Sequence, residues 1–530
     1  MMSTILFALL PLVLPQDLAQ ANQETAATAA AAVAQEASAP TTTTQTVSIS
    51  HEERVKRAYV YTVGARYILQ RTLDELLLDE IAWRKENKLA LGKIDISDAE
   101  LDAEIDMRIA TVKEQDPNLD FWKAVQAQGF TKDSFRAEIK RNMQARNMFF
   151  PDDPEAWPVD RLKTMLGDHW EQFMAKNHED LIAHKKENGE NMPINDQMLN
   201  QFLMPTVWRY MMDHAEVLYP ADGLAEGISL SVNGRTVKTD DILAIIDPFL
   251  GEHDRRLAET FVSKMEAIEA DLKAKGQWMA KEEVAVLFEA EQAEYEGAII
   301  PHEMMVVQFL GYPTMDIYQQ VFHARKSYRA NLAEEGSEEY RKQQLEIIKK
   351  RGSFYGGGKV KADVILISAQ NIETGKFPLK GDPFVSAEER AQEVAEILAS
   401  GESFDATLME YSDYPEQVPN SQPGMPQPMR GKLPPQSRND LRGFLGESDY
   451  SDFLQGYSIS DDIFFLAEPG AIYGPIRGPL GYYFYRVESR TPATREMEID
   501  DQERDLYIVN DDLLTTSFLK YASELSGSSD

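Results

Sequence analysis

Two histidine-glutamate pairs are the residues of this sequence that most readily suggest metal chemistry. His178 and His302 are each followed by a glutamate, as in the helical zinc-protease motif, where two histidines four residues apart bind the metal. Ile182 and Val306 occupy the positions of the second histidine. Neither pair therefore predicts a zinc site.

Phosphate-binding and nucleophilic motifs are also incomplete. The glycines that precede Lys359 are followed by Val360 rather than by serine or threonine, and they lack the spaced first glycine of a phosphate-binding loop. Ser458 follows Gly456 as in a nucleophile elbow, but Ser460 stands where that motif requires glycine. The chain has no cysteine, which excludes disulfides, thiolate catalysis and thiolate metal sites.

The overall charge of the chain excludes one large class of partners. The 530 residues carry a formal net charge of −34. A polyphosphate backbone requires clustered lysine and arginine, so nucleic acid is not an expected partner. An acidic surface could attract cationic polypeptides, or it could simply keep a large protein soluble. With 43% hydrophobic residues, the chain can form several cores, and we expect about two to four domains.

The N-terminal segment has the features of a secretory signal peptide. An apolar run from Ile5 to Leu14 precedes a small-x-small sequence that ends at Ala21, as is typical of signal-peptide cleavage. We assign residues 1–21 as a signal peptide and expect an exported protein of the periplasm or cell envelope; an uncleaved anchor is the alternative. Residues 22–50 are rich in alanine and threonine and predict a disordered leader. No later stretch approaches the roughly 20 apolar residues that cross a bilayer, so no stable transmembrane segment is expected after signal removal.

Helical patterns fill residues 51–150. A 3.6-residue apolar stripe predicts a long helix that Thr72 caps. Ser97 stands three residues before a glutamate and predicts the capping box of a second helix. A third helix is expected to end at Gly129, and Thr131 to begin a fourth. We therefore expect an all-helical module here.

A related plan recurs in residues 227–335. An Asn-Gly turn at Asn233 joins two predicted strands, and a helix is expected directly after them. Residues 279–284 match the start of the second helix of the first module, and residues 308–313 match residues 127–131, at a spacing of roughly 180 residues. The pattern favours a degenerate duplication, and unrelated helical packing is the alternative.

The connector between these modules, residues 151–226, is rich in tryptophan and methionine. Such side chains adapt to varied apolar partners, so one interpretation is a groove for unfolded polypeptides. The alternative is that they form an ordinary core. The candidate client-binding residues are Trp170, Met198, Phe202, Trp208 and Met211.

Strand patterns appear only after a linker, residues 336–358, whose three successive glycines predict a flexible break. Residues 359–490 then begin with alternating apolar residues that predict a strand. Ser386, three residues before a glutamate, predicts the cap of a helix. Residues 404–411 predict a second, short helix, and residues 481–487 predict a final strand.

Five short segments of this region stand out: Gly401-Glu402-Ser403-Phe404, Tyr411-Ser412-Asp413, Phe465-Leu466-Ala467-Glu468-Pro469-Gly470, Gly474-Pro475-Ile476 and Gly481 to Val487. In this order they resemble the parvulin family of peptidyl-prolyl isomerases, and the resemblance covers about 130 residues. The helical modules are similar to the client-binding part of SurA-like periplasmic chaperones, which carry parvulin domains.

The resemblance also extends to the end of the chain, residues 491–530. Proteins of the SurA type end in a helix that packs back on the N-terminal module. An apolar stripe suits such a helix here. The stripe consists of Tyr507, Leu514, Phe518, Tyr521 and Leu525.

The resemblance implies a catalytic site that this chain fills with other residues. Parvulins resemble one another in two core histidines, a cysteine or aspartate beside the substrate amide, and a methionine and a phenylalanine that hold the proline. Val364 and Tyr483 replace the histidines. Tyr414 falls at the cysteine position, or Asp413 if the match shifts by one residue. The proline-pocket positions are Gly456, Ser460 and Phe465.

We therefore expect an α+β multidomain protein, in which mostly helical SurA-like modules precede a parvulin-like α/β domain and a C-terminal helix. The expected function is that of an extracytoplasmic folding factor, a chaperone that binds unfolded or partly folded polypeptides and proline-containing segments. Isomerase activity is expected to be weak or lost, and no cofactor is implied. Two alternatives stay open. One is an active isomerase whose catalytic residues are Asp413, Tyr414 and Tyr483, and the other is a non-catalytic scaffold subunit of an envelope complex.

Overall fold

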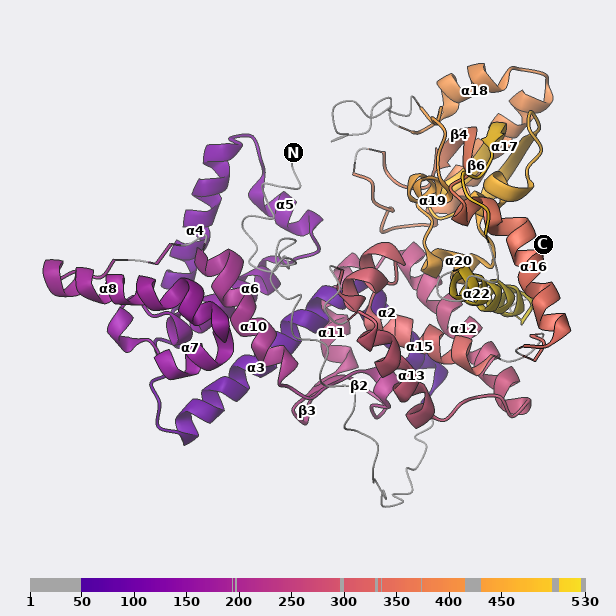
Figure 1. The fold of residues 1–530 in the computed structure, drawn as a ribbon. Helices are drawn as coiled ribbons and strands as arrows, with labels where there is room; N and C mark the ends of the chain where they lie inside the picture. Colours follow the sequence, from indigo (N-terminus) through magenta and orange to yellow (C-terminus); the bar gives the residue numbers. More distant parts are fainter. Residues whose placement is uncertain are drawn as a thin grey trace. The chain divides into compact units, whose positions relative to one another are not determined.

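The described part of this computed structural model comprises residues 49–192, 194–195, 198–295, 300–328, 332–334, 336–372, 374–414, 430–497 and 505–525. Within it the chain is mostly helical, with two three-stranded antiparallel sheets (Figure 1). This agrees with the α+β class expected from the sequence. The expected signal peptide and nearly all of the leader lie outside the described residues. No described helix is both long enough and apolar enough to span a membrane.

The chain divides into two compact units. The first unit contains Gly64–Phe249, and the second contains His51–Val63 together with Leu250–Asp530. The helix at residues 51–63 therefore belongs to the second unit, although the sequence groups it with the helices that follow. The other predicted domain boundaries stay predictions.

Four helices at the start of the first unit confirm two predicted caps and correct a third. Ser97 completes the predicted capping box, and Thr131 caps the helix that follows it. Thr72 caps nothing, because its helix already begins at Ala65. The Thr72 hydroxyl instead donates a hydrogen bond to the carbonyl of Ile68 at 2.9 Å. These helices are α3 (Ala65–Glu86), α4 (Asp98–Gln115), α5 (Phe121–Ala127) and α6 (Lys132–Phe149).

The tryptophan- and methionine-rich connector is also helical and contains two single π-turns, η2 and η3. A small antiparallel sheet follows, and the predicted Asn-Gly turn joins its second and third strands. Asn233 and Gly234 have φ angles of 49° and 79°, which a type I′ hairpin turn requires of both central residues. The elements are α7 (Val159–Leu166), η2 (Trp170–Met174), α8 (Ala175–Asn188), η3 (Leu199–Leu203), α10 (Met204–Asp213), β1 (Val217–Leu218), β2 (Ile228–Val232), β3 (Arg235–Lys238) and α11 (Thr239–Ile246).

A helical bundle forms much of the second unit, and its long helix α12 pairs with α2. Arg54 of α2 forms an ion pair with Glu269 at 2.8 Å. Tyr59 donates a hydrogen bond to Glu259, 200 residues further along, at 2.7 Å. The bundle consists of α2 (His51–Val63), α12 (Glu252–Ala274), α13 (Lys281–Ala293), α14 (His302–Met304), η6 (Met305–Phe309), α15 (Met315–Ser327), α16 (Glu338–Tyr355) and α22 (Asp505–Leu525).

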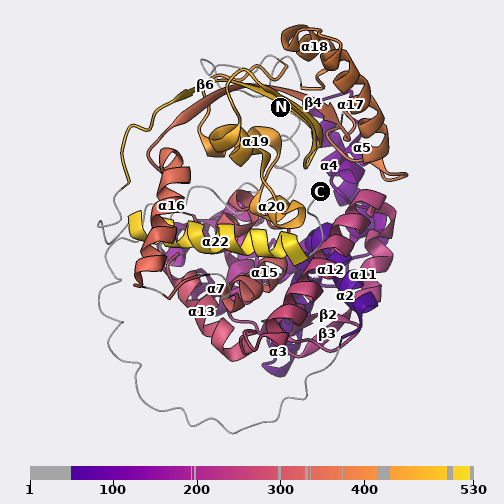
Figure 2. The same ribbon diagram turned by 90° about the vertical axis from the view of Figure 1, so that its right-hand side faces the viewer.

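The C-terminal helix α22 packs against α12, α15, α16 and α20 (Asp449–Gln455) (Figure 2). Phe518 and Tyr521 are buried, as the predicted stripe requires, whereas Tyr507 is exposed. Val509 and Leu513 complete the buried face instead. The covered face is therefore rotated from the one that the stripe predicted.

The three successive glycines form a packed turn and not the flexible break that the sequence predicts. Helix α16 runs through the expected linker to Tyr355. The carbonyl of Gly356 accepts hydrogen bonds from the backbone N–H groups of Thr494 and Arg495 at 2.8 and 3.0 Å. A Cβ added to Gly356 or Gly358 would overlap nearby backbone atoms. Glycine is needed here for close packing.

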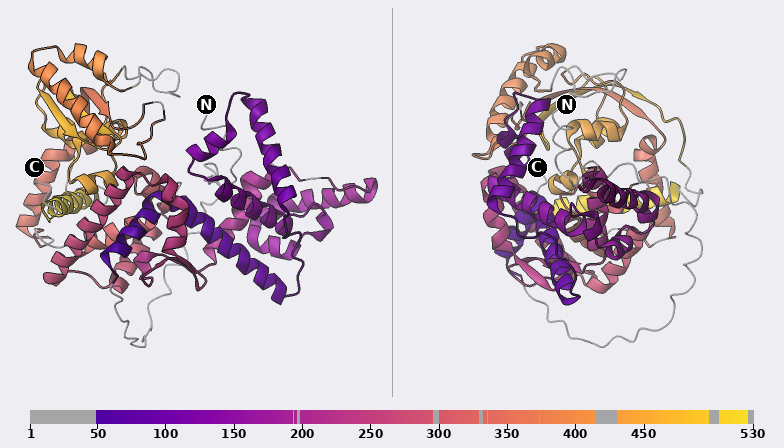
Figure 3. Two further views of the ribbon diagram at one scale, coloured as in Figure 1. Left: turned by 180° about the vertical axis from the view of Figure 1, so that it is seen from behind. Right: turned by 90° about the vertical axis from the view of Figure 1, so that its left-hand side faces the viewer.

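The sheet of the C-terminal domain has the strand order β4-β6-β5, and isolated bridges from Lys432 and Gln436 extend it beyond β4. Helices cover both faces (Figures 1 and 3). Because strand side chains alternate, Tyr482 faces α17 and α18 while Tyr483 faces α19. The elements are β4 (Lys359–Ser368), α17 (Pro383–Ala399), α18 (Phe404–Tyr411), α19 (Arg438–Leu445), α21 (Ile459–Asp461), η7 (Asp462–Leu466), β5 (Ile472–Arg477) and β6 (Gly481–Thr491).

Helices α17 and α18, which cover one face of this sheet, test the sequence prediction directly. α18 has the predicted bounds. α17 begins at Pro383, capped by the side chain of Asp382, so the predicted cap at Ser386 is wrong. Proline is favoured in the first turn of a helix, and this signal outweighs the capping-box pattern.

Candidate functional site

Tyr483, which stands at a parvulin histidine position, is part of the protein core. None of its surface is exposed. Its hydroxyl donates a hydrogen bond to the carbonyl of Leu445 at 2.6 Å and accepts one from the N–H of Leu480 at 3.4 Å. Burial raises the pKa of Tyr483 well above its ordinary value. The hydroxyl therefore serves the attachment of α19 to the sheet.

Tyr414 lies in the same buried cluster as Tyr483. Its ring stacks on Phe444 with the centroids 4.2 Å apart, and its hydroxyl donates to the carbonyl of Phe444 at 3.2 Å. Burial also raises the pKa of Tyr414 well above its ordinary value. Val364, at the other histidine position, is fully buried beside them. The cluster is packed with side chains that offer neither acid nor base at neutral pH.

Asp413 borders a hollow that Tyr414 also lines, whereas Tyr483 is not among its lining residues. Both of its carboxylate oxygens accept from the guanidinium of Arg390 at 2.9 Å, and one also accepts from the N–H of Ser368 at 2.7 Å. The hollow has a volume of about 390 Å³. It is lined by Ile372, Arg390, Glu410, Tyr411, Ser412, Asp413, Tyr414 and Arg430.

This hollow is mostly polar, and its two arginines and Asp413 already have partners. Arg390 pairs with Asp413, and Arg430 donates to the carbonyl of Met409. A ligand would have to compete with these contacts. The arrangement can hold a polar group. Among the described residues its apolar lining is limited to Ile372 and two tyrosine rings, which favours a polar ligand over a proline ring.

The three proline-pocket positions do not come together. Gly456 ends α20 and lies against Ser523 of α22. Ser460 is buried, and its N–H donates to Glu447 at 3.0 Å. Phe465 is half-buried in the π-turn η7, with the guanidinium of Arg351 5.6 Å from the centre of its ring. The structure therefore assembles no proline pocket from them.

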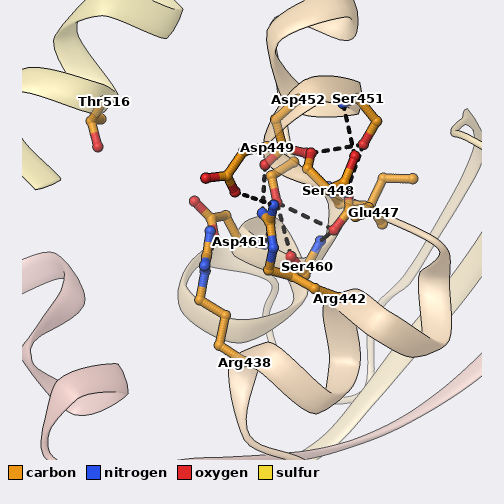
Figure 4. A network of polar contacts seen from close by, with 12 residues as sticks. Arg438, Arg442, Glu447, Ser448, Asp449, Ser451, Asp452, Ser460, Asp461 and Thr516 are labelled. Carbon is orange, nitrogen blue, oxygen red and sulfur yellow. Dashed lines mark hydrogen bonds and ion pairs between the residues drawn. The ribbon is translucent and has the colours of Figure 1, made fainter. Parts of the chain in front are cut away.

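A buried polar network around these positions escaped sequence reasoning (Figure 4). Arg442 of α19 donates to Asp449 at 2.8 Å and to Asp452. Glu447 accepts from the backbone N–H groups of Ile459 and Ser460. Burial raises the pKa of Asp452 to about 8, although Arg442 opposes this shift. The network fixes α19, α20 and α21 to one another.

Acidic residues are usually solvated, which is why this network was missed. The available signal was that Asp449 and Asp452 alternate with Tyr450 and Phe453 along one short helix. Aromatic side chains three residues apart form one apolar face that must be covered, and carboxylates beside such a face then require a buried partner.

The candidate client-binding residues separate into two groups. Trp170, Trp208 and Met211 are buried and belong to the core of the first unit, so the core interpretation holds for them. Met198 and Phe202 are half-buried. Phe202 contacts Phe173, which is 47% exposed, with the ring centroids 5.5 Å apart. Among the described residues, no group of three carboxylate or imidazole side chains could hold a metal ion.

Comparison with solved structures finds proteins that are similar to part of the chain. A peptidylprolyl isomerase, PrsA from Bacillus cereus, is 14% identical over 55% of this chain and 86% of that chain, with a TM-score of 0.17. PrsA from Bacillus subtilis is 14% identical over 56% of this chain and 90% of that chain, with a TM-score of 0.15. No family model and no curated protein matches the sequence. The site is therefore interpreted from its own geometry.

Proposed function

We propose that this protein is an exported folding factor, a SurA-like chaperone whose parvulin-like domain serves structure and binding rather than catalysis. The observation that carries the proposal is the structural role of Tyr414 and Tyr483. At the positions where parvulins need reactive groups, both side chains are buried and hydrogen-bonded to backbone carbonyls of the same domain.

Energetics support the loss of catalysis. Rotation about an X-Pro bond faces a barrier of roughly 18–20 kcal/mol, and each tenfold acceleration needs about 1.4 kcal/mol of selective stabilisation of the twisted amide. Asp413 is held by Arg390 and by the N–H of Ser368. A carboxylate that already accepts three hydrogen bonds has little capacity left for a substrate.

The helical parts support a chaperone with two related modules. Ala280 follows Ser97 by 183 residues, and Thr314 follows Thr131 by the same number (280 − 97 and 314 − 131), and each residue precedes a helix. Buried apolar residues also correspond, since Leu101 and Val284 stand four residues after the first pair. The two modules are proposed to arise from a duplication and to act on the same kind of client.

Exposed apolar side chains on both modules support client binding. Met107 and Phe173 in the first unit and Phe309 in the second are each about half exposed. Large apolar side chains at a surface lose contact with water when an unfolded polypeptide covers them, which favours binding. The proposed clients are unfolded or partly folded polypeptides.

Export is proposed from the first 21 residues of the sequence. N-terminal sequencing of the protein recovered from the periplasm or envelope fraction tests it. A mature chain that begins at Asn22 is the expected result. A chain in the cytoplasmic fraction that begins at Met1 or Met2 would contradict export.

Two assays test the proposed activity itself. The full chain should suppress aggregation of an unfolded client protein at stoichiometric amounts. Exchange spectroscopy on proline-containing peptides should detect little or no acceleration of cis-trans exchange. Strong acceleration that Asp413→Ala abolishes would favour the active isomerase instead. Recovery of one stoichiometric partner without binding to unfolded chains would favour the scaffold.

A further inference from the structure

Helix α22 packs against α12, α15, α16 and α20 of the second unit (Figure 2). The surface of α12, α15 and α20 that α22 covers, here called the groove, presents aromatic side chains to α22. Phe518 stacks on Phe453 of α20, with the centroids 6.1 Å apart and the planes 12° apart. Tyr521 stacks on Tyr328 at 4.7 Å, and its hydroxyl donates to Asp271. Two aromatic side chains three residues apart on one face of α22 therefore occupy the groove.

The walls of this groove are joined without the help of α22. Lys264 of α12 is 2% exposed, and its ammonium group donates to the carbonyls of Phe453 and Leu454 at 2.9 and 3.1 Å. These carbonyls end α20, where a cation is favoured. The N–H of Asp449, at the other end of α20, donates to the carbonyl of Leu310 at 2.9 Å. The groove is therefore expected to persist when α22 leaves.

Within the described structure, the packing of α22 also leaves some buried polar atoms without hydrogen bonds. Two buried polar atoms of α22 itself have no hydrogen-bond partner among the described residues, and each such atom weakens the docked state relative to a solvated one. They are Asp512 Oδ2 and Thr515 Oγ1. α22 also pairs Asp512 with Arg351 of α16 at 3.1 Å, so its contacts are mixed, and the unsatisfied atoms are consistent with a helix that can leave and return.

We propose that α22 is a displaceable strap, and that an amphipathic helical segment of a client polypeptide takes its place in the groove between α12, α15 and α20. This inference rests on the proposed chaperone function and locates one of its binding sites. The occupant is defined by what α22 presents, namely two aromatic side chains at positions i and i+3 of one helical face. Helices with such anchors commonly bind in apolar grooves. Gly456 contributes by letting the backbone of α20 approach α22 closely.

The absence of cysteine allows the strap to be followed directly. Ala522 of α22 is fully buried, so the thiol of an Ala522→Cys variant reacts with a maleimide only when α22 leaves. Ala391→Cys in α17 is the matched control, because Ala391 is equally buried but lies under the sheet. Both variants of the full chain are labelled alone and with excess reduced, carboxymethylated α-lactalbumin, an unfolded chain without free thiols.

The expected result is at least tenfold faster labelling of the Ala522→Cys variant in the presence of the unfolded chain, with the Ala391→Cys variant unchanged. Client binding without faster labelling would overturn the strap and leave the chaperone function intact. Equal acceleration of both variants would also overturn it, since the client would then be unfolding the second unit as a whole.

A second experiment tests whether α22 can be displaced even if no client binds. A synthetic peptide of residues 505–525 in excess should speed labelling of the Ala522→Cys variant by a similar factor. The same peptide carrying Phe518→Ala and Tyr521→Ala should have no effect. If the unmodified peptide has no effect either, α22 is a permanent part of the fold and the inference is wrong.

Discussion

Gly456 on α20 lies so close to Ser523 on α22 that an added Cβ would stand 2.7 Å from the Cβ of Ser523. Its φ of 82° is also in the left-handed region. We expect Gly456→Ala to lower the free energy of unfolding by about 2–3 kcal/mol, because backbone strain of about 1 kcal/mol and the steric overlap act together. Urea denaturation followed by circular dichroism measures the change.

Gly401→Ala provides the matched control for this prediction. Gly401 has a φ of 96°, but nothing lies within 4 Å of its added Cβ. Gly401→Ala is therefore expected to lose only the free energy of the strained left-handed backbone, about 1 kcal/mol. Equal losses in the two variants would contradict the close contact between α20 and α22.

Tyr483→Phe is expected to affect stability and not activity. The substitution leaves the buried carbonyl of Leu445 without its hydrogen bond, and we expect a loss of about 1–2 kcal/mol. Tyr457→Phe is the control, because Tyr457 is 43% exposed and water can replace its bond to the carbonyl of Arg477. Client binding should be unchanged in both. Loss of isomerisation at unchanged stability would instead make Tyr483 a catalytic residue.

His253 predicts a dependence of stability on pH. The ring is buried against Phe377 and Phe384, and burial, with help from Arg477 and Arg256, lowers the pKa of His253 from 6.5 to about 4. Below pH 6.5 the unfolded chain therefore binds a proton that the folded chain does not bind. Stability should fall as the pH drops from 6.5 to 4, by about 2–3 kcal/mol from this group.

Urea denaturation at pH 7 and pH 4.5 measures this dependence. His253→Leu should be less sensitive to acid than the unsubstituted chain. His214→Leu, at an exposed histidine, should leave the sensitivity unchanged. Parallel pH profiles for all three chains would show that His253 takes up its proton as readily in the folded protein as in the unfolded one.

Trp208→Ala and Phe173→Ala should separate core from surface in the first unit. Trp208 is 4% exposed, so its truncation should cost about 3–5 kcal/mol in the free energy of unfolding. Phe173 is 47% exposed, and its truncation should cost under about 1 kcal/mol. If the surface around Phe173 binds clients, Phe173→Ala should weaken suppression of aggregation at nearly unchanged stability. Unchanged suppression would exclude Phe173 from the client surface.

Local signals in the sequence predict local structure well. The capping box at Ser97, the cap at Thr131 and the hairpin turn at Asn233 are each set by a few neighbouring residues, and all are confirmed. The start of α3 was missed because Gly64, which precedes it, offers no side-chain cap.

Long-range pairing is what the sequence pattern does not contain. The surroundings of Gly456 depend on Ser523, and those of Lys264 depend on the end of α20. Periodicity also does not distinguish a core tryptophan from a binding tryptophan, because both lie on the apolar face of a helix. For this reason the sequence offers Trp208 as a binding candidate, and only its burial in the structure places it in the core.

The pairing of α2 with α12 has a consequence for the order in which the chain folds. α2 leaves the ribosome before the whole first unit, yet Glu259, the partner of its Tyr59, follows by 200 residues. The first unit can complete its local contacts meanwhile, whereas α2 must stay unpaired until α12 is available. Synthesis from the N-terminus therefore favours a first unit that folds early and a second unit that closes late, after its earliest helix has waited for the rest.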